Sequence, residues 1–212
     1  GKTFSPDHDI LGFQNCTHAW NYREELADVK ATGLFVTEPS LCSKDEGKTK
    51  LDLLAHGWTA LFSHTDVELK RNSGGVGAMV RNPFRVFGLK PKPKDLQCHT
   101  DKGRFGLYGI DIGGPLHAVI FVIYGWTGGH TDNLAASRTD DLCACFLAES
   151  KHWLGYPLAI FGDFNATPSR LPHLQMMIDN LGWCDVGAVA SRWGGIDSQV
   201  TCKAHSFAQP SR

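Results

Sequence analysis

The sequence lacks any apolar run long enough to cross a membrane. A transmembrane helix needs about 20 consecutive apolar residues, whereas the longest apolar run here, residues 118–124, has the length of a strand. No signal peptide is recognisable either. We therefore expect no membrane association and a nuclear or cytoplasmic location. Because the chain begins with Gly1 rather than Met, we also expect it to be an excerpt of a longer polypeptide.

An excess of basic charge is also absent. The 212 residues include 21 Lys and Arg and 22 Asp and Glu, which gives a net charge of −1. A protein that coats nucleic acid usually has a basic excess, so this role is disfavoured. An enzyme that contacts a few phosphates through a local patch and a metal stays open. The apolar fraction of 42% and the charged fraction of 20% are ordinary for a globular protein and argue against wholesale disorder.

The cysteines show no Cys-x-x-Cys spacing, so the sequence does not indicate a structural zinc site. Their number is odd, which together with the missing spacing favours free thiols in a reducing compartment. The seven are Cys16, Cys42, Cys98, Cys143, Cys145, Cys184 and Cys202.

Short apolar runs alternate with amphipathic stretches along the chain. The pattern predicts helices at 22–31, 51–55, 132–154 and 172–180, with 40–50 and 90–94 as polar loops. Strand, helix and strand over 10–37 imply a parallel pair, and 106–124 forms an antiparallel hairpin around Gly113-Gly114-Pro115. We predict an α/β fold, a four-layer sandwich of two mixed β-sheets flanked by helices, in one domain over 1–212. The predicted strands are 10–15, 34–37, 58–63, 73–80, 85–89, 106–112, 116–124 and 157–161.

The strongest chemical signal is Asp163 and Asn165, directly after the apolar run 158–161. Residues two apart in a strand point to the same side, so the carboxylate and the amide should project together while Phe164 points into the core. Asp163 can orient a water molecule and take its proton. Asn165 can donate hydrogen bonds to a phosphoryl oxygen. This pair suits phosphodiester hydrolysis; alternatively, Asp163 only caps the turn after the strand.

The run Gly162-Asp163-Phe164-Asn165 resembles the GDFN signature of the endonuclease/exonuclease/phosphatase superfamily, which has the deoxyribonuclease I-like fold. Other parts of its pattern follow in the same order and cover nearly the whole chain. They are Asn15 at the end of the first strand, Glu38 at the end of the second, the glycine-rich start of a central strand at 73–77, and Tyr124. Residues 124–128, 193–195 and 201–204 look most like endonuclease domains of non-LTR (LINE-type) retrotransposons, particularly those of dinoflagellates.

The resemblance implies a role for each of these residues. Glu38 and Asn15 would hold Mg²⁺, or Mn²⁺ in its place, since Mg²⁺ prefers one or two carboxylates together with water. Asn165 and Tyr124 would hold the substrate phosphate, and Asp163 would activate water. Each has a structural alternative: Glu38 as a surface residue before a proline, Asn15 as an ordinary strand-end residue, and Tyr124 as a packing residue.

Two departures from the superfamily pattern stand out. The superfamily often has a further Asp or Asn two residues after its first asparagine, and this position is Thr17 here. The superfamily also ends with an Asp-His pair in a Ser-Asp-His motif, and none of the ten histidines follows Ser-Asp. His8 precedes the first strand, and His130 and His205 are expected in loops. We therefore expect a truncated chain without its C-terminal strands, with an exposed sheet edge and little activity.

The sequence leaves three hypotheses about function. The first is a monomeric DNA-nicking endonuclease, joined in a longer polyprotein to a reverse-transcriptase domain. The second is another phosphodiesterase or phosphatase of the superfamily, of the RNA deadenylase, phosphoinositide or sphingomyelin type. The third is a catalytically dead remnant that only binds nucleic acid or a protein partner.

Overall fold

The structure is a computed structural model, and it describes residues 10–63, 65, 74–111, 117–193 and 196–198. The chain divides into two compact units, which we describe separately. The first comprises residues 1–124 and 148–163, and the second 125–147 and 164–212. The single domain expected over 1–212 stays a prediction.

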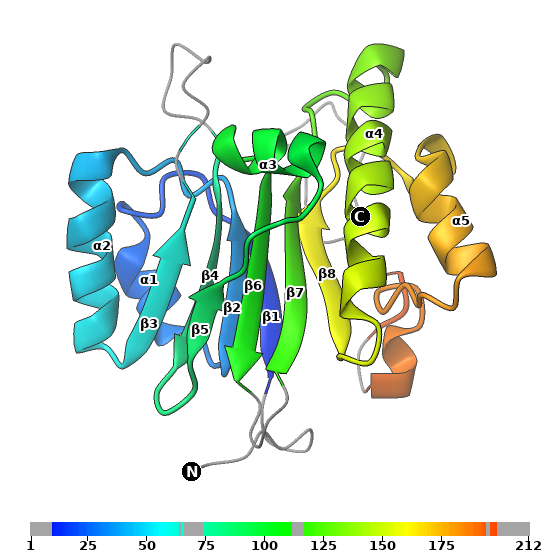
Figure 1. Cartoon of the computed structure of the whole chain (residues 1–212). Coiled ribbons are helices and arrows are strands. Elements are labelled where there is room, and N and C mark those ends of the chain that lie inside the picture. The colour runs from blue at the N-terminus through cyan, green and yellow to red at the C-terminus, as the bar shows by residue number, and fades with distance from the viewer. Residues whose placement is uncertain (1–9, 64, 66–73, 112–116, 194–195, 199–212) are drawn as a thin grey trace. The chain divides into compact units, whose positions relative to one another are not determined.

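The first unit contains two four-stranded sheets, both of mixed direction (Figure 1). In the first sheet, β1 runs parallel to β2, and β4 runs antiparallel to both β2 and β3. In the second, β5, β6 and β7 are antiparallel neighbours, while β8 runs parallel to β7. The strands of the first sheet are β1 (Leu11–Asn15), β2 (Gly33–Thr37), β3 (Trp58–Phe62) and β4 (Val76–Arg81). Those of the second are β5 (Val86–Gly88), β6 (Phe105–Asp111), β7 (His117–Tyr124) and β8 (Leu158–Asp163).

The inner faces of the two sheets share one hydrophobic core. Phe35 of β2 stacks on Phe161 of β8, with 4.5 Å between the ring centroids. Alternate residues of β4 and of β7 fill the space around this pair, because successive side chains of a strand point to opposite faces. This core includes Val76, Ala78, Val80, Ala118, Ile120, Val122 and Tyr124. It fixes how the strand ends of the two sheets meet.

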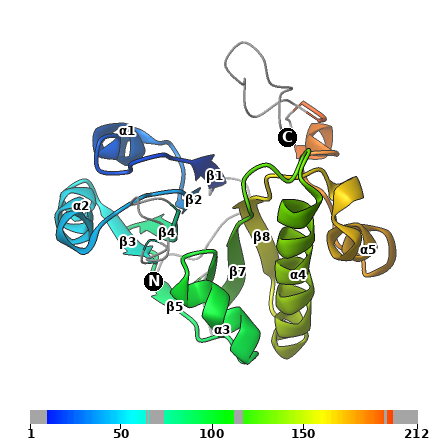
Figure 2. The ribbon, with the colours of Figure 1, turned by 90° about the horizontal axis from the view of Figure 1, so that it is seen from above.

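Helices cover the outer face of the first sheet. Helices α1 (Arg23–Asp28) and α2 (Ser43–Ala55) lie on that side (Figure 2), and Leu26 and Leu53 pack there against the fully buried Trp58. The Trp58 indole donates a 3.0 Å hydrogen bond to the Ala27 carbonyl. On the second sheet, α3 (Lys94–Asp101) lies against β6, with Leu96 buried. The predicted architecture of two mixed sheets flanked by helices is confirmed.

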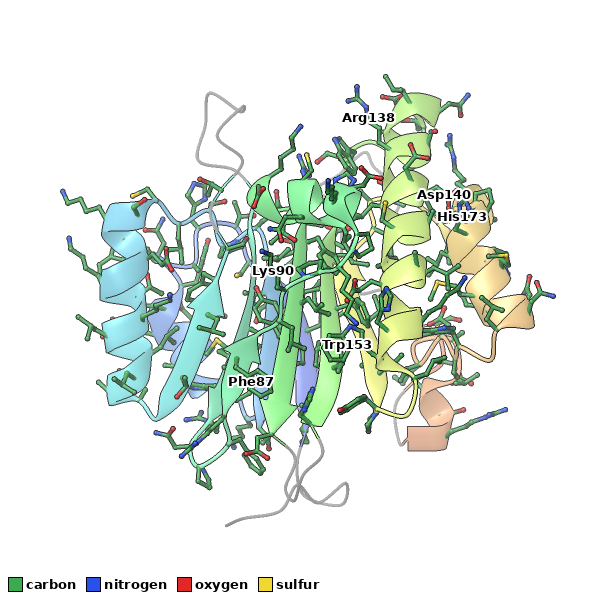
Figure 3. The ribbon with its side chains drawn as sticks, in the orientation of Figure 1. Phe87, Lys90, Arg138, Asp140, Trp153 and His173 are labelled. Carbon is green, nitrogen blue, oxygen red and sulfur yellow. The ribbon has the colours of Figure 1, made fainter. Side chains whose placement is uncertain are left out.

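In the second unit, one carboxylate joins two helices. Asp140 on α4 accepts hydrogen bonds from the backbone N–H of His173, at 2.8 Å, and from its ring Nδ1, at 2.7 Å. Figure 3 shows the two side chains together. Because Asp140 already satisfies an N–H at the start of α5, that helix end has less capacity for an external anion. The helical elements of the second unit are α4 (Asn133–Ser150), η2 (Pro168–Arg170), α5 (Pro172–Asn180) and η3 (Ala190–Trp193). The last three residues of α4 belong to the first unit.

The helices differ from the predictions in four places. Residues 40–50 are not a loop, because α2 already begins at Ser43. The first helix is shorter than 22–31 and ends at Asp28. Residues 132–154 divide into α4 and the 3-10 turn η1 (Lys151–Trp153), and α3 was not predicted. By contrast, α5 has the predicted bounds, and the predicted β6–β7 hairpin is antiparallel, although its turn at 113–115 lies outside the described residues.

Two predictions about composition can be compared with the structure. Within the part of the chain that the structure describes, no helix has the length and apolar character to span a membrane. Six cysteines are described there and all are free thiols. Cys202 lies outside the described residues.

Candidate active site

Four strands end at one edge of the first unit and bring the predicted site residues there. In the first sheet, Asn15 at the end of β1 pairs with Thr37 at the end of the parallel strand β2, directly before Glu38. In the second sheet, Tyr124 at the end of β7 pairs with Asp163 at the end of β8. The carboxyl ends of two parallel pairs are therefore gathered at one place.

Two hydrogen bonds connect these strand ends across the two sheets. The Asn15 side-chain amide donates to Asp163 Oδ2 at 2.7 Å. The Tyr124 hydroxyl donates to Glu38 Oε1. Tyr124 is buried, while Asp163 and Glu38 are half-buried and Asn15 is exposed. The structure thus places an amide, a phenol and two carboxylates side by side, with access to solvent.

The glycine-rich segment explains how Glu38 is held. Glu38 has a left-handed backbone, with φ of 54°, and its N–H donates to the Gly75 carbonyl at 3.0 Å. Gly74 and Gly75 have φ of 86° and 90°, which L-residues with a side chain rarely adopt. A Cβ on Gly75 would also lie 3.1 Å from Pro39 Cγ. Glycine at this position is therefore needed for the path of the loop that carries Glu38.

Asn165 lies beyond the strand that delivers Asp163. Because β8 ends at Asp163, the alternation of strand side chains does not extend to Asn165, which has a left-handed φ of 52°. The prediction that both project together from one strand is therefore wrong. Asn165 belongs to the second unit, where its amide donates to the Gly125 carbonyl at 3.2 Å. A Cβ on Gly125 would approach the Phe164 carbonyl oxygen to 2.3 Å, so glycine permits this close backbone contact.

The sequence analysis missed Arg104. Its guanidinium lies 4.6 Å from the centroid of the Tyr124 ring, and its carbonyl accepts the Tyr124 N–H at 2.9 Å. Arg104 is only 7% exposed. A cation on the face of an aromatic ring is attracted by the ring quadrupole. It also brings positive charge close to an edge that carries two carboxylates. The available signal was a basic residue immediately before the apolar run of β6.

The family of the chain follows from comparison with known proteins. Residues 2–207 match the endonuclease/exonuclease/phosphatase family. The chain belongs to this family. Comparison with curated proteins gives no significant match.

Solved structures of low sequence identity share the fold. The 3′-5′ exonuclease NExo of Neisseria meningitidis has 18% identity and a TM-score of 0.51, over 74% of this chain and 58% of that one. The 3′ phosphatase NExo from Neisseria, bound to a product DNA hairpin, has 16% identity and a TM-score of 0.52 over the same shares. Truncated TDP2 of Caenorhabditis elegans has 12% identity and a TM-score of 0.51, over 76% and 62%. The chain thus matches about 60% of the length of these relatives.

The oxygen atoms of Glu38 and Asn15 are of the type that binds a hard divalent cation. Among the residues that the structure describes, no group of three or more His, Cys, Asp and Glu side chains could hold a metal ion. Mg²⁺ does not need such a cage, because it binds through one or two carboxylates and retains water. Glu38, with the oxygen of the Asn15 amide, offers such a set.

Cys16, directly after Asn15, is a buried thiol near Glu38. Burial raises the pKa of Cys16 to about 12, and the charge of Glu38 contributes to the same shift. The thiol therefore stays protonated at neutral pH and is a poor metal ligand or nucleophile. Thr17, at the position of the additional Asp or Asn of the family, is exposed.

The histidines give little to the described site. His130 lies in an exposed turn, as expected, where its carbonyl accepts a hydrogen bond from Arg170. His8 and His205 lie outside the described residues, as do 194–195 and 201–204 of the retrotransposon-like segments. No role at the strand ends is assigned to any of these.

Proposed function

We propose that this chain is a metal-dependent phosphodiesterase that nicks DNA, of the kind found in non-LTR retrotransposons. The observation that carries the proposal is the pairing of Asn15 with Asp163 and of Tyr124 with Glu38 at one edge of the sandwich. These are the groups that phosphodiester hydrolysis needs: a proton acceptor, neutral hydrogen-bond donors and a carboxylate for a cation.

In this mechanism, Asp163 is the general base. It takes a proton from a water molecule, whose oxygen then attacks the phosphorus. A bond from phosphorus to oxygen breaks as the new one forms, and the leaving oxygen takes up a proton from solvent. Asn15 positions the Asp163 carboxylate through its amide hydrogen bond. The position of the base matters because proton transfer needs a heavy-atom distance of about 3 Å.

The Tyr124 hydroxyl would bind a phosphoryl oxygen of the substrate in place of Glu38. The resemblance to the superfamily implies a phosphate-binding role for Asn165 as well. Glu38 and Asn15 would hold Mg²⁺, with Mn²⁺ as a substitute. When bound, the ion supplies neutralisation of the negative charge on the phosphoryl and leaving oxygens.

The retrotransposon assignment rests on the sequence resemblance of residues 124–128, 193–195 and 201–204. It implies DNA as substrate and a neighbouring reverse-transcriptase domain as partner, with the endonuclease unit monomeric. A second candidate is action at a DNA 3′ end. It is favoured by the names of the two Neisseria structures, an exonuclease and a 3′ phosphatase. Hydrolysis of poly(A) or of a lipid head group is a third.

The test is nicking of supercoiled plasmid in the presence of Mg²⁺. Open-circular product from the wild type, absent with EDTA and absent from Asp163→Ala, would support the proposal and overturn the expectation of little activity. The matched control is Asp141→Ala, since Asp141 is an exposed carboxylate on α4; it should nick at the wild-type rate. A hairpin with a 3′ phosphate, poly(A) and a phosphoinositide, assayed in parallel, would separate the substrate classes. Retained DNA binding without Asp163-dependent cleavage of any substrate would contradict the proposal and favour a binding remnant.

A further inference from the structure

A cluster of aromatic rings lies on the outer face of the second sheet, away from the candidate active site. The His117 ring is 4.7 Å from the Tyr156 ring, 5.3 Å from Phe87 and 6.2 Å from Trp153, between centroids. We call these four residues the aromatic surface. His117 begins β7 and Tyr124 ends it, so the two places are roughly 23 Å apart, at about 3.3 Å per residue.

The aromatic surface is reachable from solvent. Phe87 is 38% exposed, and the other three rings are half-buried. Figure 3 shows Phe87, Lys90 and Trp153 on the same face, toward the viewer. Core aromatics of this unit, such as Phe105 and Phe121, are fully buried instead. The four rings are therefore not explained as part of the interior.

A buried carboxylate fixes one side of the aromatic surface. Glu149 is fully buried, and its two oxygens accept hydrogen bonds from the Trp153 indole, at 2.7 Å, and from the Lys92 backbone N–H, at 2.8 Å. The Trp153 ring and the segment around Lys92 are thereby held next to each other. This arrangement pre-organises the surface, which reduces the entropy lost when a ligand binds.

Basic side chains flank the rings on both sides. Residues 85–94 contain Arg85, Lys90, Lys92 and Lys94 and no acidic residue, and residues 150–157 contain Lys151 and His152 and no acidic residue. All six are exposed. Asp111, across from His117 in the sheet register, is the one exposed acid at this end of β6. Helix α3 adds the exposed acids Asp95 and Asp101, so five Lys and Arg side chains stand against three exposed acids, a local positive excess of two.

A hollow of about 350 Å³ adjoins the aromatic surface at Gly88, the residue after Phe87. Gln97 lines it and donates its side-chain amide to Asp101 at 3.1 Å, while its Oε1 is closed off from solvent. The hollow is lined by Gly88, Leu89, Lys90, Pro91, Gln97 and Thr100.

We infer that this face binds single-stranded nucleic acid. Rings that stack bases and cations that follow the phosphates are the parts of a single-strand groove. Lys90 and Lys151 contact phosphates, and Phe87 and Tyr156 stack on bases. Such a site would hold a displaced or flanking strand while cleavage takes place elsewhere. The inference concerns binding alone and does not depend on hydrolysis.

The test measures the affinity for a fluorescein-labelled oligothymidine of about 12 nucleotides, a length within the range that one such groove occupies. Fluorescence anisotropy is recorded in EDTA, so that no cleavage interferes. We expect Lys90→Glu and Lys151→Glu each to weaken binding roughly tenfold. Each should also lower the slope of log K against log salt by about 0.7, the value for one phosphate contact on a single strand. Lys30→Glu, an equal change of charge at an exposed lysine of the first sheet's side, should have no effect.

A stacking variant completes the test. Tyr156→Leu keeps an apolar side chain, and we expect it to weaken binding at least about fivefold, as loss of one base stack does. Far-ultraviolet circular dichroism checks that each variant is folded. Binding that is absent in the wild type, or equal for Lys90→Glu, Lys151→Glu and Lys30→Glu, overturns the inference; a protein partner would then be the alternative for this face. Plasmid nicking is scored separately, so loss of the proposed activity and loss of this site are distinguishable.

Discussion

Asn15 and Asp163 are 148 residues apart in the sequence, yet the Asn15 amide donates a 2.7 Å hydrogen bond to the Asp163 carboxylate. One residue ends the edge strand of the first sheet and the other ends the edge strand of the second. The bond therefore reports how the two sheets are aligned. It also fixes the orientation of the Asp163 carboxylate.

We expect Asn15→Ala to lower the turnover number for phosphodiester hydrolysis roughly 10- to 100-fold, the usual effect of removing a residue that orients a reactive one. If Asn15 acts only through Asp163, KM changes little, whereas a rise in KM would indicate direct binding of phosphate or metal. Gln14→Ala, at the neighbouring exposed position of β1, is the control. Unchanged turnover in Asn15→Ala would show that Asn15 does not position the Asp163 carboxylate for catalysis.

Tyr124→Phe separates packing from hydrogen bonding at the second pair. The ring remains on Arg104, but the hydrogen bond to Glu38 is lost. We expect turnover to fall at least about tenfold, since the phenol is also a donor to the phosphoryl group. Tyr108→Phe is a matched control, because Tyr108 is a buried tyrosine with only a long 3.5 Å hydrogen bond to Val76. Equal activity of both variants in steady-state nicking assays would leave Tyr124 as a packing residue.

A comparison of alanine substitutions at Gly75 and Gly57 measures the strain in the loop that carries Glu38. Both have a left-handed backbone, with φ of 90° and 81°. A Cβ on Gly57 meets nothing within 4 Å, whereas one on Gly75 would press against Pro39. We expect Gly57→Ala to cost about 1 kcal/mol of unfolding free energy. Gly75→Ala should cost roughly 2–3 kcal/mol, because steric overlap adds to the backbone term.

Urea denaturation with a common m-value gives the two free energies. Since Gly75 accepts the Glu38 N–H, displacement of this loop should also reduce nicking by Gly75→Ala but not by Gly57→Ala. Equal losses of stability in the two variants would show that Pro39 simply moves aside.

The sequence alone predicted the strand ends well. Asn15, Glu38, Tyr124 and Asp163 each follow a short apolar run, whose strand length and β-branched or aromatic residues favour a strand over a helix. Helix α5 was predicted with its exact bounds because Pro172 begins it and Gly182, with φ of 74°, follows it. These are local signals, and they do not depend on the rest of the fold.

Other features depended on distant parts of the chain. The start of α2 was missed because residues 43–50 are mostly polar, and its burial of Thr49 and Leu53 is visible only once the sheet is in place. Arg104 was missed because its partner, the Tyr124 ring, is on another strand. The two pairings across the sheets follow from the shared core, which no local pattern specifies.

A last prediction concerns stability at alkaline pH. Burial, with a smaller contribution from Glu38, raises the pKa of Cys16 from about 9 to about 12. Between these values the unfolded chain has lost the thiol proton while the folded chain retains it. Unfolding then becomes easier as pH rises, by about 1.4 kcal/mol per pH unit for this one group. Burial also raises the pKa values of Cys143 and Tyr108, which adds to the same loss.

Cys16→Ala removes one of these groups. We expect its unfolding free energy, measured with urea at pH 9 to 11, to fall less steeply with pH than that of the wild type, although it starts lower because of the cavity. Cys98→Ala, at an exposed thiol, should follow the wild-type slope. Parallel curves for Cys16→Ala and the wild type would mean that the Cys16 thiol ionises in the folded state as readily as in the unfolded chain. Water would then reach the Cys16 thiol next to Glu38, and Cys16 would have to be reconsidered as a reactive group at the site.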